Sequence, residues 1–203
     1  MLTVTGLSCV RGPRVLFRDL SFRADAGSFL QITGPNGSGK TTLLRTLAGL
    51  SRAEAGTLEW DGAGEFAHAR AYLGHAPGWK DTLSAAQNLE LAWRLDGEVV
   101  AGDAGARNAA LERAALTRQR NLPVARLSQG QRKRLHLARL TRSTRPLWLL
   151  DEPSSALDAA GQRFLAELLG EHLAAGGIAL VATHEPIAIA AADAMAQRIE
   201  LAG

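Results

Sequence analysis

A glycine-rich segment, residues 34–41, has the residue types and the spacing needed to hold a chain of phosphates. It matches the pattern G-x-x-x-x-G-K-[ST] at every fixed position. Glycines let backbone N–H groups turn inward around phosphate oxygens at the start of a helix. Lys40 would set its ammonium against the terminal phosphates, and the Thr41 hydroxyl would bind Mg²⁺. The segment therefore predicts a nucleotide site made of Gly34, Pro35, Asn36, Gly37, Ser38, Gly39, Lys40 and Thr41.

A pair of acids, Asp151 and Glu152, directly follows the apolar run 147–150 and forms the second candidate site. An aspartate at the end of such a strand reaches the hydrated Mg²⁺ in proteins with a phosphate loop. The acid after it can orient and polarise the water that attacks the γ-phosphate. Acids follow strands in many proteins, so the pair gains its meaning from the phosphate loop. We expect Thr41 and Asp151 to bind the metal and Glu152 to be catalytic.

The elements that must position these residues alternate between strands and helices along the chain. Short, continuous apolar runs near residues 147 and 178 are typical of strands covered on both faces. Strands are expected at Leu2–Cys9, Ser28–Thr33, Gly56–Gly62, Arg70–Gly74, Pro146–Leu150, Gly177–Thr183 and Arg198–Leu201. Helical patterns occupy Thr41–Leu50, Leu83–Leu95, Ala104–Arg120 and Leu127–Arg142. This order predicts an α/β fold with a mostly parallel sheet core and an inserted α-helical subdomain.

The composition excludes several classes of protein. With 203 residues, 46% hydrophobic and 21% charged, the chain has the make-up of one globular domain. Its one cysteine, Cys9, excludes an intrachain disulfide framework and a multi-cysteine metal site. The net charge of 23 − 20 = +3 is too small to require a nucleic acid partner. No apolar run reaches the roughly 20 residues of a membrane span, and the opening segment lacks a basic signal region, so we expect a soluble cytosolic chain.

Three further motifs give the chain a specific resemblance. Residues 127–131 read Leu-Ser-Gln-Gly-Gln, residues 152–158 read Glu-Pro-Ser-Ser-Ala-Leu-Asp, and His184 follows the next apolar run. By order, spacing and identity, the chain resembles the nucleotide-binding domain of ATP-binding-cassette (ABC) proteins, which have a P-loop NTPase fold. The resemblance implies a single ABC ATPase domain over residues 1–203. Residues 1–76 and 143–203 would form the nucleotide-binding α/β core with an N-terminal β-subdomain, and residues 77–142 the helical subdomain that carries the signature motif.

The resemblance also implies a homodimer that holds two ATP molecules, with Mg²⁺, in its interface. Each ATP would lie between the phosphate loop of one subunit and Ser128 and Gly130 of the other, at a helix N-terminus suited to the γ-phosphate. His184 would be catalytic by contacting the γ-phosphate and positioning the water, and Thr42 would add a hydroxyl near the α-phosphate. Asp158 would lie near the dimer interface and couple the two sites. Hydrolysis of ATP to ADP and phosphate would thus depend on dimerisation.

Three positions depart from the family pattern. Gln129 stands where the family usually has glycine, and its side chain would crowd the nucleotide. Ala76 stands where a glutamine senses Mg²⁺, so either His75 replaces that glutamine or His75 is a plain loop residue. The aromatic side chain that stacks on adenine is missing near residues 9–11, which leaves the Arg11 guanidinium as one candidate for base stacking. These departures predict slow or partner-dependent turnover.

Several segments are similar to the ATP-binding subunits of the cytochrome c maturation system, the haem-exporter family. They are Leu30–Gly34, Leu43–Leu50, Tyr72–Lys80, Asn121–Ser128 and Gly176–Ile178. This resemblance implies a peripheral ATPase at the cytoplasmic face of a bacterial inner membrane. It would work in complex with a CcmB-like integral membrane permease and other cytochrome c maturation proteins. The permease would dock near Pro77–Asn88, with Trp79 either a contact or a packing residue.

Alternatives from other classes are weighed against this reading. The ATPase of another small-molecule exporter would look alike, because only the permease differs, and a soluble ABC ATPase of iron–sulfur assembly would need no permease. A DNA-repair ATPase is disfavoured because the helical insert is short and contains no cysteine. The basic run 132–134 is expected to be a solvated helix face, so we expect no nucleic acid partner. The histidines at 68, 75, 136 and 172 are expected to be surface or packing residues rather than haem ligands.

Overall fold

In the computed structural model, residues 1–98, 103–184, 187, 189 and 196–201 are described. The chain divides into two compact units. The first contains Met1–Gly74, Arg145–Glu152 and Leu169–Gly203, and the second contains His75–Thr144 and Pro153–Leu168. The second unit thus takes in residues 153–168, which lie outside the helical segment 77–142 expected from the sequence.

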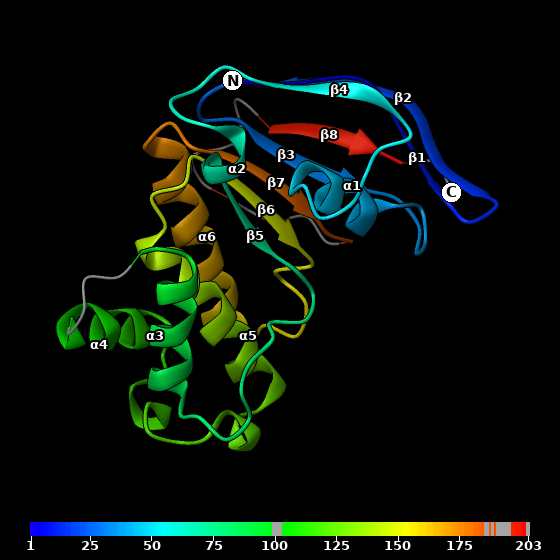
Figure 1. Ribbon diagram of the computed structural model, residues 1–203. Helices are drawn as coiled ribbons and strands as arrows, with labels where there is room; N and C mark the ends of the chain where they lie inside the picture. The colour runs from blue at the N-terminus through cyan, green and yellow to red at the C-terminus, as the bar shows by residue number, and fades with distance from the viewer. Residues whose placement is uncertain (99–102, 185–186, 188, 190–195, 202–203) are drawn as a thin grey trace. The chain divides into compact units, whose positions relative to one another are not determined.

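Two β-sheets form most of the first unit (Figure 1). The antiparallel sheet has the order β2-β1-β4, with β1 at Leu2–Arg11, β2 at Arg14–Ala24 and β4 at Ala55–Trp60. The second sheet has the order β5-β6-β7-β3-β8, and its neighbouring strands pair in parallel. Its strands are β3 (Phe29–Thr33), β5 (Arg70–Leu73), β6 (Leu147–Asp151), β7 (Ile178–Ala182) and β8 (Ala196–Glu200). The expected α/β class with a mostly parallel sheet is confirmed.

The core of the first unit explains why its central strands are continuously apolar. Every residue of β6 and β7 is buried. Helix α1 (Lys40–Leu47) packs against these two strands, and the short helix α2 (Phe66–Ala69) precedes β5. Burying one leucine side chain stabilises the fold by about 1.5–3 kcal/mol, so the many that gather here hold β3 and α1 firmly. The core includes Leu2, Val4, Leu30, Ile32, Leu43, Leu44, Leu47, Leu149 and Leu180.

Three elements are absent from the sequence-based expectations: strand β2, the four-residue helix α2 and one longer helix near the end of the chain. Strand β2 lacks regular alternation, because its pairing with β1 shifts register at three places and Asp19 has a φ of 51°. Such irregularities break the period of two by which a strand is recognised. Helix α6 (Ala159–Ala174) does bury Phe164, Leu165 and Leu168 at helical spacing, so its signal was present in the sequence.

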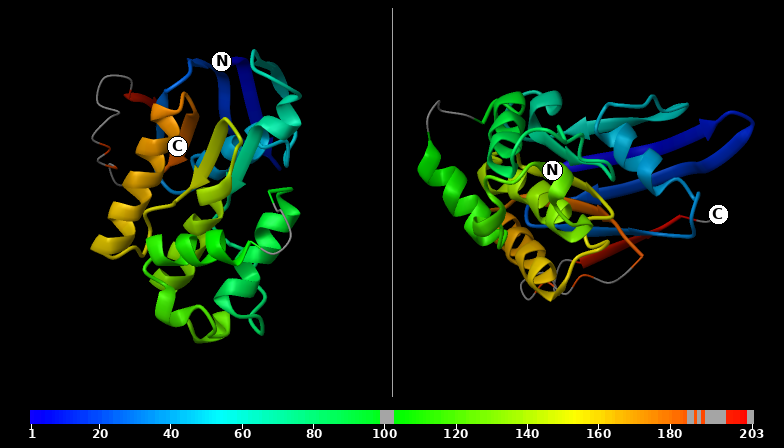
Figure 2. Two further views of the ribbon diagram at one scale, coloured as in Figure 1. Left: turned by 90° about the vertical axis from the view of Figure 1, so that its left-hand side faces the viewer. Right: turned by 90° about the horizontal axis from the view of Figure 1, so that it is seen from below.

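Helices make up most of the second unit. In it, α3 (Ala85–Leu95), α4 (Ala104–Arg113) and α5 (Gln129–Ala138) pack against one another (Figure 2). The helix expected over 104–120 ends at Arg113, and Ala115 takes a left-handed φ of 52° that a helix cannot continue through. No helix within the described ranges is both long and apolar enough to cross a membrane. Single 3₁₀ turns lie at Thr117–Gln119, Val124–Arg126 and Arg139–Arg142.

The first unit contains a histidine, His172, that is held in its neutral form. Its ring stacks on Trp148 with centroids 3.9 Å apart and planes 9° apart, and its Nε2 lies 3.1 Å from the Ile178 carbonyl oxygen. Burial lowers the pKa of His172 from 6.5 to about 4. Below pH 6.5 the unfolded chain therefore binds a proton that the folded chain excludes. The stability contributed by the neutral ring is present above pH 6.5 and is lost as the pH falls from 6.5 to 4.

We expect the free energy of unfolding to fall by about 1 kcal/mol through His172 alone between pH 7 and pH 5.5. Urea unfolding of the chain at both pH values measures this change. His172→Phe keeps a ring to stack on Trp148 and removes the titrating group. The free energy of unfolding of this variant should therefore fall by about 1 kcal/mol less between the two pH values. His68→Gln is the matched control, because the His68 side chain is 83% exposed. If the free energy of unfolding of His172→Phe falls as much as that of the unchanged chain, His172 is not the source of the pH dependence.

Candidate functional site

The phosphate loop joins β3 to α1 in the first unit, and its glycines have backbone angles that other residues rarely adopt. The φ angles are 143° at Gly34, 80° at Gly37 and 103° at Gly39. A Cβ on Gly34 would collide with the Leu201 carbonyl oxygen and would lie 2.7 Å from the Ser38 hydroxyl. Glycine is therefore required at this turn, and the backbone N–H groups of such a turn are ready donors for an anion.

Two polar side chains inside this loop fit an anionic ligand. Lys40 is 7% exposed, and its ammonium donates to the carbonyl oxygens of Gly34 at 2.7 Å and Pro35 at 3.1 Å. The Ser38 hydroxyl is buried and has no hydrogen-bond partner among the residues that the structure describes. An unsatisfied buried hydroxyl costs about 1–3 kcal/mol, and a buried ammonium is costly without an opposite charge. Phosphate oxygens would satisfy both groups, so the loop fits a nucleotide.

Thr41 and Asp151 meet where α1 begins and β6 ends. The Thr41 hydroxyl donates to the two carboxylate oxygens of Asp151, at 3.1 and 3.0 Å. Asp151 is buried, and its negative charge adds to the effect of burial in raising the pKa of the Tyr72 phenol. A hydroxyl and a carboxylate supply the hard oxygen ligands that Mg²⁺ prefers. The two residues expected to bind a metal are thus in contact.

Glu152 and His184 meet at the same edge of the parallel sheet. They follow the neighbouring strands β6 and β7, whose ends pair Asp151 with Ala182. The Glu152 N–H donates to the Ala182 carbonyl oxygen at 2.9 Å, and its backbone takes a left-handed φ of 50°. Its carboxylate lies 3.1 Å from Nε2 of His184. The carboxyl edge of a parallel sheet is where α/β proteins place ligands, and this pair can orient and polarise a water there.

The residues expected to meet the phosphate of a second copy begin α5, in the second unit. Ser128 caps this helix: its hydroxyl accepts the Gln131 N–H at 3.2 Å, and its own N–H donates to the Gln131 side chain at 2.9 Å. Ser128 and Gln129 are both exposed. A Cβ on Gly130 would lie 3.0 Å from the Ala156 carbonyl oxygen, so a larger residue would press on that backbone. The first turn of a helix leaves N–H groups that an anion can accept from.

Two other residues expected near the nucleotide, Thr42 and Asp158, lie at the beginnings of helices. Thr42 is half-buried within α1, one residue after Thr41. Asp158 precedes α6 and accepts the N–H of Gly161 at 2.9 Å, which places its carboxylate at a helix start. Its side chain is 61% exposed and lies 3.9 Å from the Arg134 guanidinium.

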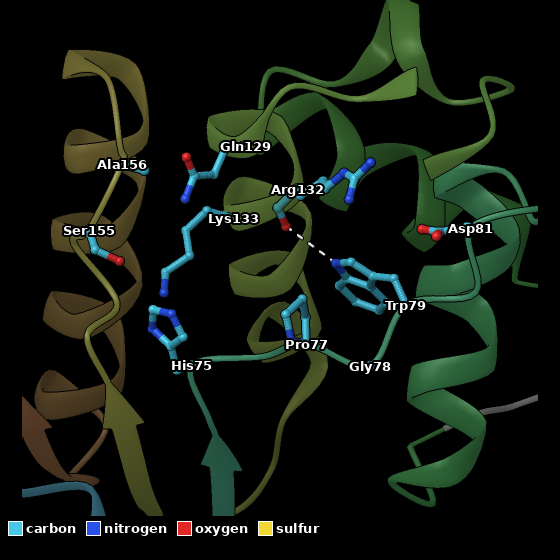
Figure 3. A pocket seen from close by; sticks show the side chains of 10 residues that line it. All are labelled: His75, Pro77, Gly78, Trp79, Asp81, Gln129, Arg132, Lys133, Ser155 and Ala156. Carbon is cyan, nitrogen blue, oxygen red and sulfur yellow. Dashed lines mark hydrogen bonds between the residues drawn. The ribbon is translucent and has the colours of Figure 1, made fainter. Parts of the chain in front are cut away.

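A cavity of about 320 Å³ lies within the second unit, beside the first turns of α5 (Figure 3). Lys133 extends across it toward the ring of His75. Ala76, which stands where the family has a glutamine, is exposed. Trp79 lines the same cavity, and its Nε1 donates to the Arg132 carbonyl oxygen at 3.4 Å. His75 therefore faces a cavity of its own unit, and Trp79 is anchored to α5.

The basic run 132–134 is not the solvated face that the sequence predicts. Arg134 is 9% exposed, and its guanidinium donates to the Ala114 carbonyl oxygen at 3.2 Å, at the end of α4. Arg132 donates to the carbonyl oxygens of Leu127 and Ala125, at 3.2 and 3.0 Å. Consecutive residues point to different sides of a helix, so only part of such a run can face water. The expectation is wrong for Arg134, which is buried against a backbone carbonyl oxygen, whereas Arg132 is half-buried.

A glycine-rich loop between a strand and a helix, with acids at the end of a nearby parallel strand, defines a P-loop nucleotide-binding domain. The chain belongs to the ABC transporter family, because the model of that family, described as ABC transporter, matches residues 17–155. It is therefore an ABC-type ATPase that binds nucleotide.

Within this family the chain is similar to proteins named cytochrome c biogenesis ATP-binding export protein CcmA. It is 46% identical to the CcmA protein of Rhodopseudomonas palustris strain BisB5. The alignment spans 198 residues, which are 95% of this chain and 96% of the relative. It is 43% identical to the CcmA protein of Pseudomonas aeruginosa. That alignment spans 195 residues, which are 93% of this chain and 95% of the relative.

Two solved structures share the fold. An ABC transporter ATP-binding protein of Pyrococcus furiosus superposes with a TM-score of 0.83 at 22% identity, over 98% of this chain and 96% of that one. A dimeric ATP-binding cassette in a post-hydrolysis state, bound to ADP and Pi, superposes with a TM-score of 0.77 at 23% identity, over 91% and 88%. The fold of an ABC ATPase domain is thereby confirmed.

Proposed function

We propose that this chain is the ATP-hydrolysing subunit of a membrane ABC complex in cytochrome c maturation and haem delivery, where it couples ATP binding and hydrolysis to a permease. The observation that carries the proposal is its 42–48% identity to CcmA proteins over 91–96% of the chain. The intact phosphate loop and the two polar pairs at the sheet edge support it, because a degenerate cassette would lack them.

In the proposed site, the phosphate loop and Thr42 bind ATP, while Thr41 and Asp151 hold Mg²⁺. The bound ion would neutralise charge on the β- and γ-phosphates. The Lys40 ammonium exchanges its two carbonyl partners for phosphate oxygens. Glu152 accepts a hydrogen bond from the attacking water and polarises it, and His184 holds that water and the γ-phosphate in position.

The proposed assembly is a homodimer at the cytoplasmic face of the inner membrane, with a CcmB-like permease as its partner. Ser128 and Gly130 of one copy complete the phosphate site of the other, which is consistent with the exposed, capped start of α5. Residues 1–76 and 143–203 act as the nucleotide-binding core, and residues 77–142 as the subdomain that carries the signature motif. The permease docks near Pro77–Asn88.

Complementation of a strain that lacks its own copy tests this function. The unchanged chain should restore covalent haem on c-type cytochromes, read by haem staining of gels, and Glu152→Gln should restore less than about a tenth of it, because it lacks the water-activating base. Detergent capture of the tagged chain from membranes should bring down a polytopic membrane protein. Normal haem attachment in the deletion strain would contradict the proposal, and capture of soluble iron–sulfur assembly proteins alone would favour the alternative.

A further inference from the structure

The turn between β1 and β2 lies beside the phosphate loop, although the two are distant in sequence. Arg11 pairs with Arg14 in the register of this hairpin, around Gly12 and Pro13. One guanidinium nitrogen of Arg14 lies 3.6 Å from the point that a Cβ on Gly37 would occupy. Because Gly37 is a residue of the phosphate loop, the Arg14 head group lies beside that loop.

The same strand is anchored to the loop at a second place. A Cβ on Gly39 would lie 3.0 Å from Cβ of Leu16 and 3.2 Å from Cδ1 of Phe17. Phe17 is buried in the core of the first unit. The position of Arg14 beside Gly37 is therefore set by the packing of the residues that follow it, and not by the hairpin turn alone.

Among the described residues, none gives the Arg14 side chain an anionic partner. It is exposed and forms no ion pair or side-chain hydrogen bond with any residue that the structure describes. By contrast, Arg23 pairs with Asp25 at 2.8 Å and Arg139 pairs with Asp96 at 2.8 Å. A guanidinium presents its donors in a planar fork that matches phosphate oxygens. Beside a loop that binds phosphates, such a group has an obvious ligand.

We propose that Arg14 is a further nucleotide-binding residue, whose guanidinium contacts the terminal phosphates from the antiparallel sheet. This inference rests on the proposed function and adds a second cation to the site. Lys40 reaches the phosphates from inside the loop, where it now bonds the Gly34 and Pro35 carbonyls, and Arg14 reaches them from beside Gly37. The contact would strengthen nucleotide binding in a chain that lacks the family's aromatic residue near Cys9–Arg11.

Calorimetric titration of the full chain with MgATP and with inorganic tripolyphosphate tests this assignment. Arg14→Gln should lower the affinity for both ligands about tenfold, because both present the phosphates that the guanidinium contacts. Arg14→Lys should recover part of the loss, since it restores the charge without the planar fork. Arg18→Gln is the matched control: it removes the same charge from an exposed position on the same strand and should leave both affinities unchanged.

Each other result overturns the proposal in a distinct way. Unchanged affinities in Arg14→Gln would show that Arg14 does not touch the nucleotide. A loss for ATP without a loss for tripolyphosphate would place the guanidinium on the adenine instead. An equal loss in Arg18→Gln would reduce the effect to the overall charge of the strand. If the unchanged chain binds neither ligand, the proposed function fails together with this inference.

Discussion

Replacing Lys40 with alanine should lower ATP hydrolysis by the chain in its membrane complex at least about a hundredfold, the usual effect of removing one preorganised donor from a developing charge. The ammonium is buried and lies on the Gly34 and Pro35 carbonyls, where a phosphate chain would pass. Alanine leaves the backbone of the loop unchanged but removes the one lysine in it. ATP affinity should fall as well, because the ammonium contacts the phosphates before and during the reaction.

The steady-state release of phosphate by the purified complex measures this effect. Arg52→Ala is a matched control, since it removes one positive charge from an exposed position beyond α1 and should leave the rate unchanged. Lys40→Arg should not restore hydrolysis. The loop encloses the slender lysine side chain, which is only 7% exposed, and the larger guanidinium does not fit in that space. Phosphate release within threefold of normal in Lys40→Ala would contradict the role of the loop.

Glu152→Gln should abolish hydrolysis, by about a hundredfold or more, while it preserves ATP binding. Glutamine has the shape of glutamate and can still hydrogen-bond His184, which lies 3.1 Å away, but it cannot polarise water as a base does. The bound ATP is then not consumed. A dimer that closes on ATP should therefore accumulate, because its release depends on hydrolysis.

Two measurements on the same sample separate these effects. Phosphate release should be lost, and light scattering of the chain with MgATP should show a dimer that is absent without nucleotide. Glu167→Gln, at an exposed position on α6, is the matched control and should behave like the unchanged chain. Near-normal turnover of Glu152→Gln in the reconstituted complex would show that another group activates the water.

The nucleotide loop and the sheet-edge acids could be predicted from the sequence because each signal is local. The glycine and lysine positions of residues 34–41 follow directly from the needs of a phosphate ligand. Asp151 was recognisable because it ends a wholly apolar run, which the structure shows as the buried strand β6. The cap of α5 also has a local signature, since Ser128 is followed three residues later by Gln131.

Long-range packing accounts for what the sequence could not predict. The bulged strand β2 hides its own period, and with it the approach of Arg14 to Gly37. In the sequence, Arg134 cannot be distinguished from an arginine on a solvent-exposed helix face. Its hydrogen-bond partner, the Ala114 carbonyl oxygen, lies at the end of another helix. The cavity at His75 likewise needs α5 and the chain near Ser155 to be placed first.

The central claim of this account is that ATP is bound by two copies of the chain at once. A structure of the Glu152→Gln dimer with MgATP measures it directly. We predict that the Ser128 hydroxyl of one copy lies within about 3 Å of a γ-phosphate oxygen held by the loop of the other. A nucleotide-loaded assembly in which Ser128 of every copy is beyond hydrogen-bond reach of all γ-phosphates would contradict the claim.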